Sequence, residues 1–435
     1  MERIRINNFA GLREVDTAVS PVTGFIGPQA SGKSIIAKLL YFFREVASRL
    51  PDAAIRFGPG SAHYRDFCVA RFNGFFSVGV TAGASDFHIT YTSGSEHVSV
   101  ESAPDQGKPG SRRLEWSAFY PSALESLAKK RGEHLSALGE AYGESTSDAQ
   151  EKLLREFDEE AKKVLDRWPI YQHVFIPAGR AFFSQFARNV FSVLQSGADL
   201  DPFMVAFGAY LEQTRGFLQA AHLFDPASAD AGRFGGIGPL MKSILHAELG
   251  FDEKEKQYFL QHDDGRRVWM GQASSGQQEA LPLLLVLARS FSRPHGRGRA
   301  LYIEEPEAHL FPPAQKQIVE LLGRVFRSRA DEMNLVVTTH SPYILTSFNN
   351  LVQAGKLYRR YRETKARPAK AFELSKTIPS SFDPGVVSFY ALEGGSAKSI
   401  MDPETGLIDA GMIDQVSADI AIEFDKLLSE ADEKP

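Results

Sequence analysis

The sequence has little cysteine, no long hydrophobic run and no apolar leader. Cys68 is the only cysteine among 435 residues, which excludes an internal disulfide and a cysteine-rich metal cluster and fits a reducing compartment. The apolar run Leu281–Ala288 is far too short to cross a bilayer. Near the start, Arg3 and Arg5 alternate with Ile4 and Ile6 as in a strand and no apolar run follows, unlike a signal peptide. We therefore expect a cytoplasmic protein that does not contact a membrane.

Positive charge is not in excess either. Lysine and arginine number 49 against 54 aspartate and glutamate residues, which gives a net charge of −5. No global basic field attracts nucleic acid or anionic lipid, although a local patch can still do so. Apolar residues are plentiful at 43%, with 11% aromatic residues, which is enough for packed cores in two or three domains.

The segment GPQASGKS, residues 27–34, matches the phosphate-binding P-loop. It follows a short apolar run that predicts a strand (22–26) and precedes an apolar run that predicts a helix. In such a loop, backbone N–H groups face the phosphates, Lys33 adds a positive charge and the Ser34 hydroxyl ligates Mg²⁺. The predicted nucleotide contacts are Gly27, Pro28, Gln29, Ala30, Ser31, Gly32, Lys33, Ser34 and Ile35, and Lys33 is also a predicted catalytic residue.

Two adjacent carboxylates follow a second predicted strand, residues 300–303. A P-loop enzyme needs such a pair, because one carboxylate holds the hydration shell of Mg²⁺ and the next orients and deprotonates the attacking water. We assign the metal role to Glu304 and the catalytic role to Glu305. A surface acidic turn is the alternative, but an acid pair directly after a buried strand needs a reason to be there.

Two further segments offer groups to phosphates. His340 comes just after the predicted strand 334–339, where it can donate to a γ-phosphate or hold the attacking water against Glu305. Taken alone, a histidine at such a position is more often structural. The small-residue loop Ala273–Gln277 runs into an apolar helix and offers N–H groups and serine hydroxyls, either as a second anion site or as an ordinary helix cap. A second anion site makes sense if it closes over the nucleotide of another subunit.

The rest of the chain predicts strands and helices around these motifs. Alternating apolar residues predict antiparallel strands at 75–80 and 86–92. Apolar residues between Leu153 and Trp168 share one helical face, and residues 171–180 predict a strand followed by a turn. Residues 181–250 have a mostly helical pattern.

The four motifs, in this order, resemble those of the ATP-binding-cassette ATPases of the SMC, RecF and OLD-like group, and most closely the stand-alone AAA-type ATPases of bacterial antiphage systems. The resemblance implies an α/β fold: a P-loop ATPase head with a mixed sheet, an antiparallel section and an inserted helical lobe. It also implies ATP and Mg²⁺ as cofactors, a homodimer or higher oligomer, and hydrolysis at the dimer interface.

The resemblance assigns roles by position. Ser274, Ser275, Gly276 and Gln277 would be the signature that meets the partner's ATP. The D-loop would include Glu307–Leu310, and His340 would be the switch histidine. Glu304 stands where aspartate is more usual, and no Q-loop glutamine is evident, so Arg180 and Gln185 are the candidates there.

The expected domains follow from these motifs. They are the first half of the head (1–114), a helical insertion (115–168), a strand with a helical lobe (169–268), the second half of the head (269–350) and a C-terminal part that completes it (351–435), with a turn at 401–409 and a final amphipathic helix at 413–430.

The C-terminal part bears on function. Glu393 faintly resembles the first acidic residue of a Toprim nuclease domain, but no Asp-x-Asp pair follows it, so we do not expect a fused nuclease. We expect a nucleotide-driven switch or scaffold in an antiphage system that controls a separately encoded, nuclease-like effector. One alternative is a RecF-like ATPase that clamps DNA, and another is an ATP-binding scaffold with little turnover.

A basic stretch, residues 356–370, is where nucleic acid could bind, because it interleaves cations with two tyrosines. A solvated strand and loop is the plainer interpretation. The candidate contacts are Arg359, Arg360, Arg362, Lys365 and Arg367.

Overall fold

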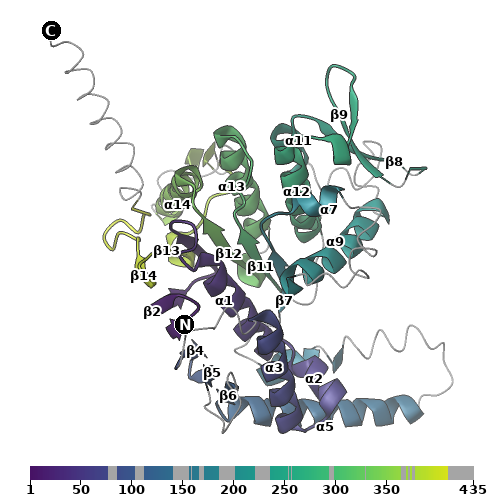
Figure 1. Ribbon diagram of the computed structural model, residues 1–435, viewed down its shortest axis with the longest axis vertical. Coiled ribbons are helices and arrows are strands. Elements are labelled where there is room, and N and C mark those ends of the chain that lie inside the picture. Colours follow the sequence, from purple (N-terminus) through teal and green to yellow (C-terminus); the bar gives the residue numbers. More distant parts are fainter. Residues whose placement is uncertain are drawn as a thin grey trace.

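A mixed sheet of eleven strands runs through the molecule, with helices on both of its faces (Figure 1). The predicted α/β head with a mixed sheet and an antiparallel section is therefore confirmed. The computed structural model describes residues 1–76, 86–102, 112–140, 156–157, 159–165, 171–185, 201–220, 236–252, 254–255, 257–292, 298–328, 330–363, 369–370, 373–374 and 378–409.

Five neighbouring strands of the sheet run parallel to one another. Most of their described residues are buried, as expected for strands that are covered on both faces. Since parallel strands end at the same edge, the loops that follow them meet there. In spatial order the strands are β13 (Val387–Glu393), β3 (Val22–Ile26), β12 (Met333–Thr339), β11 (Gly298–Glu304) and β7 (Tyr171–Ile176).

The other half of the sheet is antiparallel. The short strand β14 (Ser396–Ser399) joins the halves, because it pairs antiparallel with β13 and parallel with β2. The remaining strands, from β14 outward, are β2 (Leu12–Val19), β1 (Glu2–Phe9), β4 (His88–Ser93), β5 (Glu96–Ser102) and β6 (Arg112–Trp116). Ile89 and Tyr91 are buried in β4 while His88 is exposed, which confirms the alternation expected for 86–92.

Each face of the sheet carries its own hydrophobic core. Successive side chains of β11 alternate between them: Leu301 belongs to one core and Tyr302 to the other. The helices that contribute to the first core include α9 (Pro202–Ala220), α11 (Gly238–Leu245), α12 (Ser275–Ser292), α13 (Pro312–Arg327) and α14 (Pro342–Glu363). Those of the second core include α1 (Lys33–Ser48), α2 (Leu50–Phe57), α3 (Ser61–Phe75) and α5 (Phe119–Glu140).

Two outlying parts lie at opposite ends of the molecule. Helices α2, α3 and α5 gather at one end, and strand β9 lies at the other (Figure 1). Within 156–165 the described residues are helical and bury Phe157, Ala161 and Leu165, as the predicted apolar face requires, while Leu153 and Trp168 lie outside the described residues. The other outlying part was not anticipated: it is an antiparallel sheet of β8 (Glu248–Asp252), β9 (Gln257–Gln261) and β10 (Arg267–Trp269).

Two expectations about local structure are wrong. Phe75 ends helix α3 and does not begin a strand, and residues 77–80 lie outside the described part of the chain. Phe72 and Phe76 pack against Phe9, so tertiary contacts override the short alternating pattern.

The basic stretch was also misjudged, because the part up to Glu363 is the end of α14 and not a strand. Its helix continues a buried face that includes Leu351 and Val352. The predicted turn at 401–409 is confirmed by three hydrogen bonds that Asp402 Oδ1 accepts. Residues 413–430 lie outside the described part, and the predicted domain boundaries remain a prediction.

Candidate functional site

Three of the predicted motifs lie in loops that start at one edge of the parallel strands, whereas the signature loop comes after β10 of the smaller sheet. The P-loop follows β3, the acid pair ends β11, and His340 directly follows β12. These three strands are neighbours in the order β3, β12, β11. The topology therefore brings together groups that lie more than 300 residues apart in the sequence, such as Lys33 and His340.

The P-loop is a tight turn that needs its glycines. A Cβ on Gly27 would lie 2.4 Å from the carbonyl oxygen of Leu392 on β13, so β13 approaches too closely for a side chain. Gly32, directly before α1, has a φ of 96°, which favours glycine. The Lys33 ammonium donates to the carbonyls of Gly27 and Pro28, at 2.8 and 2.7 Å. Burial lowers the Lys33 pKa, and the nearby carboxylates Glu305 and Glu307 act in the opposite direction.

The start of α1 suits an anion. The first turn of α1 carries no acidic side chain, so no carboxylate competes for its N–H groups. Ser31 Oγ in the loop is buried and has no hydrogen-bond partner. A bound phosphate would supply the acceptors that these groups lack.

The acid pair divides into a buried and a more exposed carboxylate. Glu304 is 6% exposed, and its Oε2 accepts a hydrogen bond from the Ala178 N–H at 3.1 Å. The Glu305 side chain is 31% exposed and its backbone has a φ of 42°, in the left-handed region. Its N–H donates to the carbonyl of Thr338 at 2.9 Å, which ties the end of β11 to β12.

Glu307 connects the acid pair to His340. Its Oε1 accepts from the Thr339 hydroxyl at 2.6 Å and from the His340 N–H at 2.9 Å. The His340 Nδ1 lies 3.7 Å from Glu305 Oε1 and 3.8 Å from Glu307 Oε1. The imidazole is 41% exposed, so it can turn towards a ligand beside Glu305. The resemblance predicts Glu307 in the D-loop, but this link to His340 was not expected.

The residues at this edge fit a magnesium nucleotide. Four of their buried oxygens have no hydrogen-bond partner, which costs free energy unless a ligand forms hydrogen bonds with them. An Mg²⁺ ion with its water shell provides donors for such oxygens, and it usually binds through one or two carboxylates together with phosphates. The four are Ser31 Oγ, Glu304 Oε1, Glu307 Oε2 and Thr338 Oγ1.

The signature loop caps its helix and touches the D-loop of the same chain. At the start of α12 the Gln277 N–H donates to Ser274 Oγ, and Gln277 Oε1 accepts from the Ser274 N–H, which is a capping box. A Cβ on Gly276 would lie 2.7 Å from the His309 carbonyl oxygen, so the two loops are in close contact. Among the described residues, no hydrogen bond joins this loop to the P-loop. Ser275 is exposed and remains open to another molecule.

The Q-loop candidates follow β7. Arg180 is fully buried, and its guanidinium donates to carbonyls, among them that of Glu304 at 2.6 Å. It therefore does not offer its charge to a nucleotide directly. Gln185 is the last residue of α7 (Ala181–Gln185).

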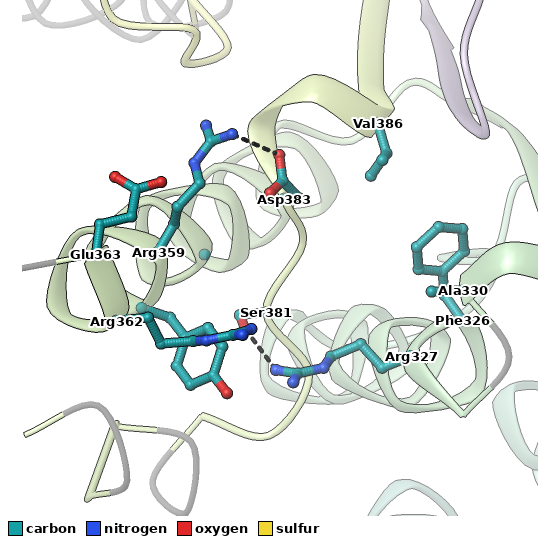
Figure 2. A pocket seen from close by; sticks show the side chains of 11 residues that line it. Phe326, Arg327, Ala330, Arg359, Arg362, Glu363, Ser381, Asp383 and Val386 are labelled. Atoms are coloured by element: carbon teal, nitrogen blue, oxygen red, sulfur yellow. Dashed lines mark hydrogen bonds and ion pairs between the residues drawn. The ribbon is translucent and has the colours of Figure 1, made fainter. Parts of the chain in front are cut away.

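The basic stretch lies far from these loops. Helix α14 begins beside His340, and its 22 residues extend about 33 Å at 1.5 Å per residue. Its far end lines a pocket of about 490 Å³ together with the end of α13 (Figure 2). Arg359 pairs with Asp383 at 3.4 Å, and Arg327 donates to the Ser381 hydroxyl at 2.8 Å (Figure 2).

The aromatic ring in this pocket is already in contact with cations. The guanidinium carbons of Arg327 and Arg362 lie 5.5 and 5.9 Å from the centre of the Tyr358 ring. These contacts leave the ring less available for base stacking. Lys365 and Arg367 lie outside the described residues.

The described residues include no group of three or more histidine, cysteine, aspartate or glutamate side chains that could hold a metal ion. None of their helices is both long and apolar enough to cross a membrane.

The P-loop, the acid pair and the α/β sheet that carries them are features of AAA-type P-loop ATPases. Residues 22–346, well over half of the chain, match the family model described as "AAA domain, putative AbiEii toxin, Type IV TA system", and the chain belongs to this family. Among curated proteins, none is similar enough to count as a match.

Solved structures with a similar course of the chain include two SMC heads and RecF. The SMC head bound to the C-terminal winged-helix domain of ScpA is 11% identical over 92% of this chain and 96% of its own, with a TM-score of 0.43. The SMC head domain from Thermotoga maritima is 10% identical over 92% and 97%, with a TM-score of 0.38. The recombination mediator protein RecF is 10% identical over 92% and 97%, with a TM-score of 0.33. At these values the likenesses carry no argument about activity or partners.

Proposed function

We propose that the chain binds Mg-ATP at the edge formed by β3, β12 and β11 and hydrolyses it to ADP and phosphate. The observation that carries this proposal is the convergence of Lys33, Glu305 and His340 beside buried oxygens that lack partners. Lys33 would exchange its loop carbonyls for phosphate oxygens. Glu305 would orient the attacking water and accept its proton, while His340 would donate a hydrogen bond beside it.

Magnesium fits the same edge. Ser34 and Glu304 would hold the ion, which would neutralise charge on the phosphates. Glu304 is longer than the aspartate more usual at this position. Its Oε2 is fixed by Ala178 and its Oε1 is free of protein partners, so one oxygen is left for a metal-bound water.

Steady-state phosphate release tests the enzyme assignment. Glu305→Gln keeps the shape of the side chain but removes the base, so we expect hydrolysis to fall by about 100-fold or more. ATP binding, measured by fluorescence titration, should remain. Glu320→Gln is a matched control, because its side chain is also 31% exposed but lies on the outer part of α13. Equal phosphate release by Glu305→Gln and the unaltered protein would leave an ATP-binding scaffold with little turnover.

We further propose that two copies of the chain enclose ATP between them. The signature loop has no hydrogen bond to the P-loop of its own chain among the described residues, while Ser275 is exposed. Two exposed aromatic residues flank the site: Phe311, just after the D-loop, is 79% exposed, and Tyr343, just after His340, is 52% exposed. Exposed aromatic rings of this kind are enriched where proteins bind one another.

The biological role that we propose is a cytoplasmic switch in an antiphage system that controls a separate effector, nuclease-like in character. The family description, which names a toxin of a toxin–antitoxin system, supports a role of this kind. Tagged Glu305→Gln protein, recovered from its native host in Mg-ATP, should bring with it a second protein in fixed proportion. Recovery of DNA without a protein partner would instead favour a RecF-like clamp.

A further inference from the structure

A buried hydrogen-bond network links the acid pair to the signature helix. Arg180 follows β7, and its guanidinium donates to four backbone carbonyls. The nitrogen–oxygen distances are 3.2 Å to Glu279, 3.1 Å to Pro177, 2.6 Å to Glu304 and 3.0 Å to Glu305. One side chain therefore bridges the loops after β7 and β11 and the helix α12.

Glu279 completes the network from the side of α12. It lies four residues after Ser275, the first residue of this helix, and its side chain is 1% exposed. Its two carboxylate oxygens accept from the N–H groups of Arg180 and Ala181, at 2.9 and 2.6 Å. Burial lowers the Arg180 pKa, and Glu279 is the largest of the opposing charges. A buried charge pair of this kind is expensive to disturb, because either partner alone would be left uncompensated.

The network fixes the backbone on both sides of Glu305. The Glu305 N–H is held by the Thr338 carbonyl, and its own carbonyl is held by Arg180 Nη2. The φ of 42° at Glu305 is unusual for a residue with a side chain, so it persists only where the surroundings hold it. The direction of the carboxylate towards His340 depends on this backbone geometry, and a misplacement of about 1 Å can cost a reaction roughly 100-fold.

We propose that Arg180 and Glu279 are positioning residues that hold the backbone of Glu305 and link it to the first turns of α12. When the start of α12 engages the nucleotide of a partner chain, α12 shifts, and the network transmits this shift to Glu305 of the same chain as α12. This inference rests on the proposed role of Glu305 in hydrolysis.

The variants Arg180→Lys and Glu279→Gln test this inference. In Arg180→Lys, an ammonium cannot bridge the four carbonyls that the guanidinium reaches in three segments. In Glu279→Gln, the side-chain NH₂ faces one of the two backbone N–H groups that the carboxylate accepts from, so one hydrogen bond is lost. We expect kcat for phosphate release to fall by about 10- to 100-fold, because Glu305 is misplaced. The affinity for a fluorescent ATP analogue should stay within about twofold, because neither residue contacts the P-loop.

Arg299→Lys is the matched control, since Arg299 is also fully buried but lies at the other end of β11. A thermal melt of each protein reports the cost of the substitution to folding. A role in stability alone would lower the melting temperature of Arg180→Lys and Arg299→Lys and leave kcat per folded molecule unchanged. If Arg180→Lys does not fold, Glu279→Gln carries the same prediction.

The outcomes separate this inference from the proposed function. Unchanged kcat in folded Arg180→Lys and Glu279→Gln, with Glu305→Gln inactive, would overturn the inference alone. A parallel loss of kcat and ATP affinity would also overturn it, since that pattern reports a disturbed binding site. If the unaltered protein releases no phosphate, or Glu305→Gln is as active as it, the proposed function fails and this inference fails with it.

Discussion

Truncation of the exposed ring of Phe311 should weaken an ATP-dependent dimer. Phe311 lies between the D-loop and α13 and is 79% exposed in the single chain. A second chain that approaches this edge to complete the ATP site would cover the ring. Phe311→Ala removes apolar surface without disturbing the core.

The expected magnitude follows from the exposed area. A phenylalanine offers about 200 Å² for burial, so an exposed fraction of 79% leaves about 160 Å². At about 25 cal/mol per Å², complete burial would contribute about 4 kcal/mol. Incomplete burial and the cost of ordering reduce this figure, and we expect a loss of about 2 kcal/mol per ring. Because a symmetric dimer buries the ring of each chain, the loss per dimer is about 4 kcal/mol, which corresponds to roughly a 1,000-fold weaker dimerisation constant.

Sedimentation equilibrium in Mg-ATP measures this effect. The Glu305→Gln background prevents hydrolysis, so the nucleotide-bound state accumulates. Ile55→Ala is the control, because Ile55 is also an exposed apolar residue, at 40%, but lies on α2 away from the site. A dimerisation constant that Phe311→Ala leaves within twofold of the control would refute the assignment of this surface.

Two further predictions concern the cores. Gly24→Ala places a Cβ 2.0 Å from the Phe389 ring and should lower the free energy of unfolding, measured by chemical denaturation, by about 2 kcal/mol. Gly74→Ala is the control, because a Cβ there meets open space and should not lower it. Equal stability of the two variants would contradict this packing. Burial raises the Cys68 pKa to about 12, so Ellman's reagent at pH 8 should label it only after unfolding. Because the unfolded thiol ionises at lower pH, the free energy of unfolding should fall as pH rises through about 9 to 12. Rapid labelling of native protein would count against this burial.

The motifs could be predicted from the sequence because each is a short contiguous segment. Lys33 ends a glycine-containing loop between an apolar strand and a helix, and Glu305 directly follows an apolar strand; the chemistry of a phosphate site requires those residue types there. Because parallel strands all end at the same edge of a sheet, the residues that follow them meet there. The resemblance predicted one nucleotide site for these residues, and the parallel strands of the sheet show how the chain brings them to one edge.

What could not be predicted depends on contacts that are distant in sequence. Arg180 and Glu279 are 99 residues apart, and only the fold shows that they meet behind the acid pair. A hint was present in SSGQQE, where an acidic residue enters an otherwise apolar helix. Phe75 was misjudged because aromatic residues are enriched in strands, whereas here the packing of its neighbours Phe72 and Phe76 against Phe9 favours a helix.

A complementation experiment tests the central claim, that ATP is hydrolysed at a site shared by two chains. Glu305→Gln removes the catalytic carboxylate, and Ser275→Arg blocks the exposed signature loop. Each variant alone should release almost no phosphate. Their equimolar mixture should regain about a quarter of the normal rate, because half of the dimers are mixed and each mixed dimer has one complete site of two. Full activity of Ser275→Arg alone, or no recovery in the mixture, would contradict the account.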